Sequence, residues 1–154
     1  MDTTTYSTVP CYSLCLVKEK DLKYPVEKLS HSGEAVRALQ VYLEDRDSEY
    51  LVVLMLDAAN NMTGVATAAV GGITGLSCKV RDVFKHAIVG RAHAIILGHN
   101  HPSGDVNPSK EDVAFTEKVV EAGKILGVPV VDHVIISSGM RSASFSFQEH
   151  GMIP

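Results

Sequence analysis

Apolar residues along the chain follow two different spacings. Segments in which they recur every three or four residues predict amphipathic helices, and short apolar or alternating runs predict strands. The predicted helices cover residues 32–43, 80–90 and 109–126. The predicted strands cover residues 11–17, 49–56, 94–98, 130–137 and 142–147. A further stretch, residues 62–76, is typical of a strand that passes into an irregular, glycine-containing loop.

The segment EYLVVLML, residues 49–56, is the strongest strand signal. It is almost continuously apolar, which is typical of a central strand covered on both faces. Strands and helices alternate through the rest of the chain, with Ser32 as a candidate cap of the first helix and Gly127 at the end of the last one. This order predicts an α/β or α+β sandwich, in which helices cover the faces of a mixed sheet.

Length and composition fit one soluble domain. The chain has 154 residues, of which 45% are hydrophobic and 21% are charged, and it contains no repeat or low-complexity segment. Such values are ordinary for a globular fold, and single cores usually hold about 100 to 200 residues. We therefore expect one domain over residues 1–154, with roughly the first ten residues disordered.

No segment of the sequence predicts a membrane span or a secretion signal. The longest apolar run, residues 51–56, is far shorter than a spanning helix requires, and the polar start MDTTTYSTVP lacks the parts of a signal peptide. A cytoplasmic protein is expected. The three cysteines, Cys11, Cys15 and Cys78, are then expected to be reduced thiols, and we assign them no chemistry.

The formal net charge of −4 argues against a protein that binds nucleic acid over its whole surface. Basic side chains do cluster around the second predicted helix: Lys79, Arg81, Lys85, His86 and Arg91. A solvated helix face explains such a cluster at least as well as a nucleic-acid contact does. Nucleic-acid binding is therefore only a weak expectation.

Two histidines follow the short strand of residues 94–98, in the stretch HNHPSGDVNPSKED. Side chains two residues apart on an extended backbone point the same way, so His99 and His101 can present two imidazoles to one point. Ligands usually bind at the carboxyl ends of strands in open α/β sheets. The pair therefore indicates a metal site, and a plain polar turn between a strand and a helix is the alternative.

Asp112 has two interpretations. Ser109-x-x-Asp112 at the start of the third predicted helix resembles a capping arrangement, which taken alone is the better explanation. Together with His99 and His101, however, a carboxylate in the first helical turn can complete a His-His-Asp set. Three protein ligands and one open position are the composition of a catalytic zinc site.

The same residues match a longer signature. The pattern H-x-H-P-x6-S-x2-D, from His99 to Asp112, resembles that of the JAMM (JAB/MPN) metalloprotease domain. The strings VRDVFKHAI, AHAIILGHNHPSG and AGKILGVPVVDHVII resemble the bacterial RadC-like branch of that superfamily, and the similarity runs from about Ser32 to Met152. The resemblance implies a three-layer α/β/α sandwich, similar to that of cytidine deaminases, which binds one zinc ion through His99, His101 and Asp112.

The resemblance also implies roles for two further residues. Glu49, at the head of the segment EYLVVLML, matches the family glutamate that acts as general acid/base on a metal-activated water. Its alternative is a solvent-facing residue at a strand end. Ser109 matches the serine that donates its hydroxyl to the developing oxyanion, and its alternative is the helix cap.

Asp132 and His133 interrupt the apolar strand of residues 130–137 and match a "DH" pair of RadC-like sequences. A role beside the metal ligands, or in packing, is expected for them rather than direct ligation. RadC-like proteins often carry a helix-hairpin-helix module at the N-terminus. We expect none here, because only some thirty residues precede the first predicted helix, and a DNA-repair role is weakened accordingly.

These observations predict a zinc metallohydrolase of the JAMM type, a peptidase or isopeptidase. The alternative is a non-catalytic, zinc-stabilised module in a DNA-repair, mobile-element or phage-defence complex. A zinc nucleobase deaminase is disfavoured because the chain has neither H-x-E nor P-C-x-x-C. A serine hydrolase is disfavoured because no G-x-S-x-G occurs.

Overall fold

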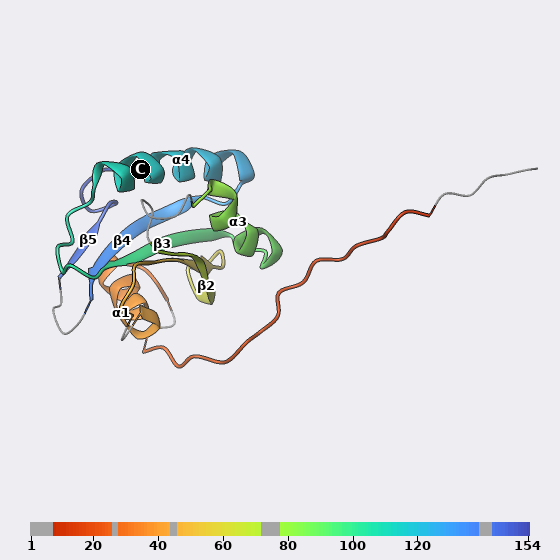
Figure 1. The fold of residues 1–154 in the computed structure, drawn as a ribbon, viewed down its shortest axis with the longest axis horizontal. Helices are drawn as coiled ribbons and strands as arrows, with labels where there is room; N and C mark the ends of the chain where they lie inside the picture. Colours follow the sequence, from red (N-terminus) through yellow and green to blue (C-terminus); the bar gives the residue numbers. More distant parts are fainter. Residues whose placement is uncertain (1–7, 26–27, 44–45, 72–77, 139–142) are drawn as a thin grey trace, which may run out of the picture.

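The chain folds around a five-stranded mixed sheet, which a computed structural model describes for residues 8–25, 28–43, 46–71, 78–138 and 143–154 (Figure 1). The helices within these residues are α1 (Ser32–Leu43), α3 (Val80–Val89) and α4 (Lys110–Leu126). The strands are β1 (Tyr50–Leu56), β2 (Met62–Val70), β3 (Ala94–His101), β4 (Val130–Ser137) and β5 (Ser144–Ser146).

The strands lie in the order β2-β1-β3-β4-β5. β1 is antiparallel to both β2 and β3, β3 is parallel to β4, and β5 pairs antiparallel to β4 at the far edge. Two parallel neighbours need a crossover connection, and α4 supplies it between β3 and β4. The sheet is therefore mixed, as the order of elements predicted.

Helices cover both faces of the sheet (Figure 1). On one face Leu51 and Val53 of β1 belong to a core cluster with Phe84 of α3, and α4 contributes to the same cluster. On the other face Val52 and Leu54 pack in a cluster with α1. Both sides of β1 are thus buried, which accounts for its lack of alternation and confirms the predicted α+β sandwich.

Helix α4 begins and ends where the sequence predicts. Ser109 is its N-cap, and its Oγ accepts a hydrogen bond from the backbone N–H of Asp112 at 3.0 Å. Gly127 ends the helix with a φ of 69°, a left-handed conformation that glycine adopts at little cost. No helix within the described ranges combines the length and the apolar character that crossing a membrane requires.

Strand β3 is longer than predicted. The apolar pattern ends at Gly98, but the strand continues through His101, because His99 pairs with Ile135 and His101 with Ser137 of β4. On the opposite side His99 pairs with Leu51 of β1. The polar stretch H-N-H is therefore strand rather than loop, and its side chains are held in a fixed register.

The predicted strand over residues 11–17 is wrong. This part of the chain has no strand pairing and runs outward past the end of α3 (Figure 1). Leu16 lies against Gly90 there, but Tyr12 and Leu14 are each 84% exposed. Alternation alone cannot form a strand when no neighbour pairs with it. Three other predictions fall wholly or partly outside the described residues: disorder of the first ten residues, the loop that follows β2, and the start of the segment 142–147.

Candidate metal centre

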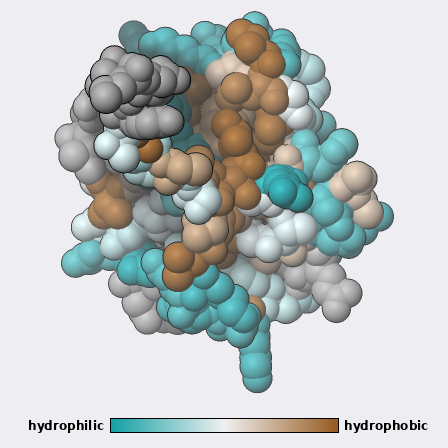
Figure 2. Space-filling model, turned by 90° about the vertical axis from the view of Figure 1, so that its right-hand side faces the viewer, coloured by the Kyte–Doolittle hydropathy of each residue, from teal (hydrophilic) through white to brown (hydrophobic). Residues whose placement is uncertain are grey.

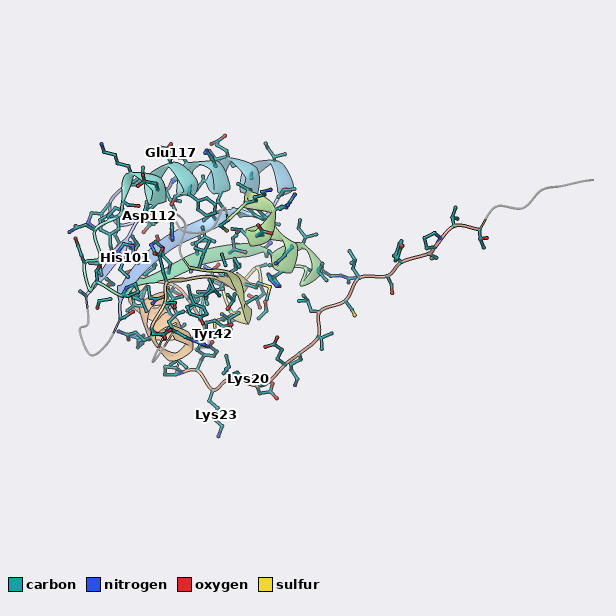
Figure 3. All side chains as sticks on the ribbon, viewed as in Figure 1. Lys20, Lys23, Tyr42, His101, Asp112 and Glu117 are labelled. Atoms are coloured by element: carbon teal, nitrogen blue, oxygen red, sulfur yellow. The ribbon has the colours of Figure 1, made fainter. Side chains whose placement is uncertain are left out.

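Four side chains from three parts of the chain meet where β3 ends and α4 begins. Glu49, His99, His101 and Asp112 each offer one ligand atom, and these atoms all lie within 4.8 Å of one another. Figure 3 shows His101 and Asp112 close together on the left of the molecule, near the start of α4. We call these four side chains the metal centre. The structure thus brings together the three predicted ligands and the predicted acid/base.

Strand geometry aligns the two histidines. His99 and His101 are two residues apart in β3, so both side chains project toward the face that α4 covers, while Asn100 projects toward the other. Their Nε2 atoms lie 2.9 Å apart. His99 is fully buried, and His101 is partly exposed. One ring is therefore fixed inside the protein, and the other borders solvent.

The first turn of α4 presents Asp112. Its Oδ1 lies 3.5 Å from His99 Nε2, and its Oδ2 lies 3.7 Å from His101 Nε2. Oδ2 also accepts hydrogen bonds from the backbone N–H of Ser109 at 2.8 Å and from the Ser109 hydroxyl at 2.6 Å. The capping box and the approach to the histidines therefore coexist, so the two interpretations of Asp112 do not exclude each other.

Glu49 reaches the site from the neighbouring strand. It immediately precedes β1, whose register opposite His99 sets the Glu49 backbone across from the end of β3. Its side chain is half-buried. A pocket of about 310 Å³ opens beside it, and its lining also includes His101, Ser109 and Asp112. Solvent can thus reach the metal centre from this side.

The electrostatics of the metal centre favour a cation. Burial lowers the pKa of His99 to about 4, so this ring is neutral at neutral pH. Burial opposes ionisation of Asp112, but hydrogen bonds from His101 and Ser109 outweigh it and hold the pKa of the carboxyl well below its usual range. The Asp112 carboxylate raises the pKa of His101. A buried negative charge thus lies among imidazole nitrogens, an arrangement that attracts a proton or a metal ion.

A second contact orients the outer histidine. His101 Nδ1 lies 2.5 Å from the backbone carbonyl of Asp105. A carbonyl oxygen only accepts, so Nδ1 carries a proton. Nε2 faces His99 and Asp112, and it would bind an ion through its lone pair once unprotonated. Nitrogen and carboxylate lone pairs that converge on one point are the donor set that zinc prefers. The residues present therefore fit one zinc ion.

Sequence reasoning missed the function of Asn100. This fully buried side chain accepts a hydrogen bond from the backbone N–H of Tyr50 at 2.8 Å and donates one to the backbone carbonyl of Ser48 at 2.9 Å. It thereby holds the backbone on both sides of Glu49. The only hint in the sequence was the polar Asn100 between two histidines, because on an extended backbone it points away from both of them.

The Asp132–His133 pair divides between two environments. His133 Nε2 lies 2.8 Å from His99 Nδ1. Asp132 instead accepts hydrogen bonds from the Ser146 hydroxyl at 2.6 Å and from the backbone N–H of Gln148 at 3.0 Å. His133 therefore contacts a candidate ligand from behind, and Asp132 joins β4 to the chain around β5.

The basic cluster lies away from the metal centre. Arg91 precedes β3, whereas the centre is at the other end of that strand, and eight residues of strand span about 26 Å. Lys79, Arg81 and Lys85 are exposed, while burial lowers the pKa of His86. This surface therefore does not border the pocket at Glu49.

Comparison with known proteins identifies the family. A family model described as "RadC-like JAB domain" matches residues 29–152. The chain is 44% identical over 134 residues to a UPF0758 protein of Thermotoga maritima, which covers 86% of this chain and 58% of that protein. It is 44% identical over 125 residues to a UPF0758 protein of Rubrobacter xylanophilus, with 81% of this chain and 53% of that protein covered.

A UPF0758 protein of Methanococcoides burtonii is 40% identical over 129 residues, which are 84% of this chain and 55% of that protein. The chain thus spans about half the length of the curated relatives it matches. The matched region includes every strand of the sheet and all four residues of the metal centre. This chain belongs to the RadC-like JAB domain family.

Proposed function

We propose that the chain is a zinc-dependent hydrolase that cleaves peptide or isopeptide bonds. The observation that carries the proposal is the convergence of Glu49 with His99, His101 and Asp112 beside one solvent-accessible pocket. Membership of the RadC-like JAB family, within the JAMM-type superfamily, supports a metal-dependent hydrolase. The choice of an amide bond rests on the resemblance to JAMM metalloproteases.

His99, His101 and Asp112 would hold the ion. Zinc with three protein ligands keeps a fourth position for solvent, lowers the pKa of water there to about 7 and polarises a carbonyl. The protein supplies the rest of the site. The strand register fixes the two histidines, and the capping box fixes the carboxylate.

Glu49 is placed to move a proton. Its carboxylate lies within 4.8 Å of each ligand atom of the other three side chains, and it borders the pocket through which a substrate enters. A carboxylate in such a position can accept a proton from water and deliver it to a leaving amine. General acid/base catalysis of this kind is worth about 10² to 10⁴ in rate.

Ser109 has one hydroxyl proton and two proposed uses for it. In the structure the hydroxyl donates to Asp112 Oδ2. To donate to an oxyanion in the pocket it would have to turn away from that carboxylate, which the backbone N–H of Ser109 would continue to hold. The oxyanion role of Ser109 is therefore proposed for the reaction, because in the structure its hydroxyl bonds to Asp112.

Metal analysis combined with a cleavage screen tests the proposal. The wild-type chain should bind one zinc ion and cleave members of a peptide and isopeptide library. His99→Ala and Asp112→Ala should lose zinc, whereas Glu49→Gln should keep zinc and lose at least about a hundredfold in turnover.

Two outcomes would contradict the proposal in different ways. A wild-type chain that neither contains nor takes up zinc contradicts the metal centre. A zinc-loaded wild type that cleaves nothing, with Glu49→Gln indistinguishable from it, contradicts hydrolysis and favours the non-catalytic, zinc-stabilised module.

A further inference from the structure

A chain of buried hydrogen bonds runs from His99 back to Asp112. His99 Nδ1 lies 2.8 Å from His133 Nε2, and His133 Nδ1 lies 2.6 Å from Thr116 Oγ1. The Thr116 hydroxyl also lies 2.6 Å from the backbone carbonyl of Asp112, one helical turn earlier. His99 and His133 are fully buried, and Thr116 is 2% exposed, so these groups are out of reach of bulk solvent.

The proton positions in this chain follow from its end at Asp112. A carbonyl oxygen only accepts, so its contact with Thr116 uses the one proton of the hydroxyl. Thr116 Oγ1 must then accept from His133 Nδ1–H. A neutral imidazole carries one N–H and one lone pair, so His133 Nε2 accepts from His99 Nδ1–H. The Nε2 of His99 is left with a lone pair directed at the metal centre.

The opposite arrangement has two defects. If Thr116 donated to His133, its remaining lone pairs would face the Asp112 carbonyl at 2.6 Å. The same shift would place a proton on His99 Nε2, between the ring and the position of the ion. Only the first arrangement satisfies the buried contacts and leaves His99 able to bind a metal.

We propose that Thr116 and His133 are positioning residues that hold His99 in the tautomer competent for metal binding, and that they do so through the backbone carbonyl of Asp112. This inference rests on the proposed zinc site. Asp112 would then act at the site in two ways. Its carboxylate would bind the ion, and its carbonyl sets the proton position of His99 through the chain Thr116–His133–His99, which we call the relay.

Thr116→Val tests the relay with little change in volume. Valine cannot accept from His133 Nδ1–H, so the metal-competent tautomer of His99 would leave a buried donor unpaired. We expect zinc affinity, measured by competition with a chelator of known affinity, to fall about ten- to a hundredfold. Thr116→Ser, which retains the hydroxyl, should restore it. Thr67→Val on β2, which removes a hydroxyl bonded to Tyr42, is the matched control and should bind zinc like the wild type.

The proton positions in the relay can also be measured directly on the wild type. Long-range ¹H–¹⁵N correlation spectra of the zinc-loaded chain report which ring nitrogen of each histidine carries a proton. The relay requires His133 to be protonated at Nδ1 and bare at Nε2, and Thr116→Val should shift or broaden these signals although the fold is retained by circular dichroism. A purely structural role for Thr116 would change the unfolding midpoint alone.

The outcomes separate the relay from the proposed function. If the wild type binds zinc but His133 carries its proton on Nε2, the relay is wrong and the zinc site stands. The same conclusion follows if folded Thr116→Val binds zinc as tightly as the wild type. A wild type that takes up no zinc overturns both proposals.

Discussion

At the scale of single residues, Asp112 makes a different contact with its backbone N–H, its carboxylate and its backbone carbonyl. Its backbone N–H bonds to the Ser109 hydroxyl, its carboxylate accepts from Ser109 and faces two histidines, and its carbonyl accepts from Thr116. The helix cap therefore orients Asp112 as a proposed ligand and does not compete with that role. The hydrogen bonds between Ser109 and Asp112 that stabilise the first turn of α4 also hold the Asp112 carboxylate in place.

Ser109→Ala separates the cap from the oxyanion role of Ser109. Loss of an N-cap side chain costs about 1 kcal/mol of stability, so urea unfolding should show a decrease of that size. Zinc affinity should fall less than tenfold, because the backbone N–H of residue 109 still holds Asp112 Oδ2.

Turnover decides between the two roles of Ser109. Loss of an oxyanion donor lowers kcat by about 10² to 10³. A decrease of that size in zinc-loaded Ser109→Ala supports the oxyanion role, whereas kcat within about threefold of the wild type limits Ser109 to the cap. Ser109→Thr, which keeps a capping hydroxyl, is the control for stability.

At the scale of elements, the antiparallel pairing of β1 with β3 brings Glu49, the proposed acid/base, next to the proposed ligands His99 and His101. Asn100 joins this junction to the chain after β4, because its Nδ2 also donates to the Ser138 hydroxyl at 2.9 Å. The histidines on either side of Asn100 project toward α4, and Asn100 itself binds the segment that carries Glu49. One tripeptide, His99–Asn100–His101, therefore contains two proposed ligands and positions the proposed acid/base.

Asn100→Ala should lower turnover more than it lowers zinc affinity. The change leaves the Tyr50 N–H and the Ser48 carbonyl without their partner, at about 1 to 3 kcal/mol for each buried group that stays unpaired. Glu49 then loses its fixed position, while no side chain that would bind zinc loses a contact with Asn100.

Kinetics and zinc titration on the same protein sample check the Asn100 prediction. The matched control is Asn61→Ala, which removes an exposed asparagine bonded to Asp57 in the turn between β1 and β2. If Asn100→Ala loses zinc and activity in equal measure, Asn100 supports the whole site rather than Glu49.

Much of this architecture could be predicted from the sequence because hydrophobic burial determines it. The three helices and the strands at residues 50–56 and 130–137 have clear apolar periodicity, and both ends of α4 carry recognisable caps. His99, His101 and Asp112 could be predicted because the H-x-H spacing, the capping box and the resemblance coincide in one stretch of the sequence, whereas Glu49 was predicted from the resemblance alone.

What could not be predicted depends on pairing and on helix rotation. The extension of β3 to His101 could not be predicted because the residues that extend it, His99–Asn100–His101, are polar. Residues 11–17 do not form a strand because no other strand pairs with them, which their own sequence cannot reveal. The relay requires β4 beside β3 and Thr116 turned toward the sheet. Thr116 follows Asp112 by four residues, so the sequence could predict that both lie on the same face of α4. It could not predict that Thr116 contacts His133.

At the scale of the whole molecule, polar chemistry and exposed apolar surface lie at opposite ends. Figure 2 shows hydrophobic side chains gathered on the end that faces right in Figure 1, where α3 and the last turns of α4 lie. Ile88 is 52% and Ile125 86% exposed. Since this end is remote from the ligands, Ile125→Ser provides a neutral surface variant for comparison with ligand variants.

Zinc should stabilise the folded chain as a whole. An ion that binds only the folded state adds about 2.7 kcal/mol when free zinc is a hundred times its Kd. Thermal unfolding of the wild type should therefore shift upward with added zinc and downward with a chelator, and His99→Ala should respond to neither, unlike Ile125→Ser. An unfolding midpoint of the wild type that ignores zinc would argue against a site formed only on folding.

The position of Glu49 outside the β3–α4–β4 unit has an evolutionary consequence. The proposed ligands and the relay all lie within residues 99–133, a single strand–helix–strand unit, whereas the proposed acid/base comes from a segment fifty residues earlier. One substitution at position 49 could therefore abolish the proposed reaction while the proposed zinc site and its scaffold persist. A fold built this way can give rise to descendants that retain the metal as a structural element and lose the reaction.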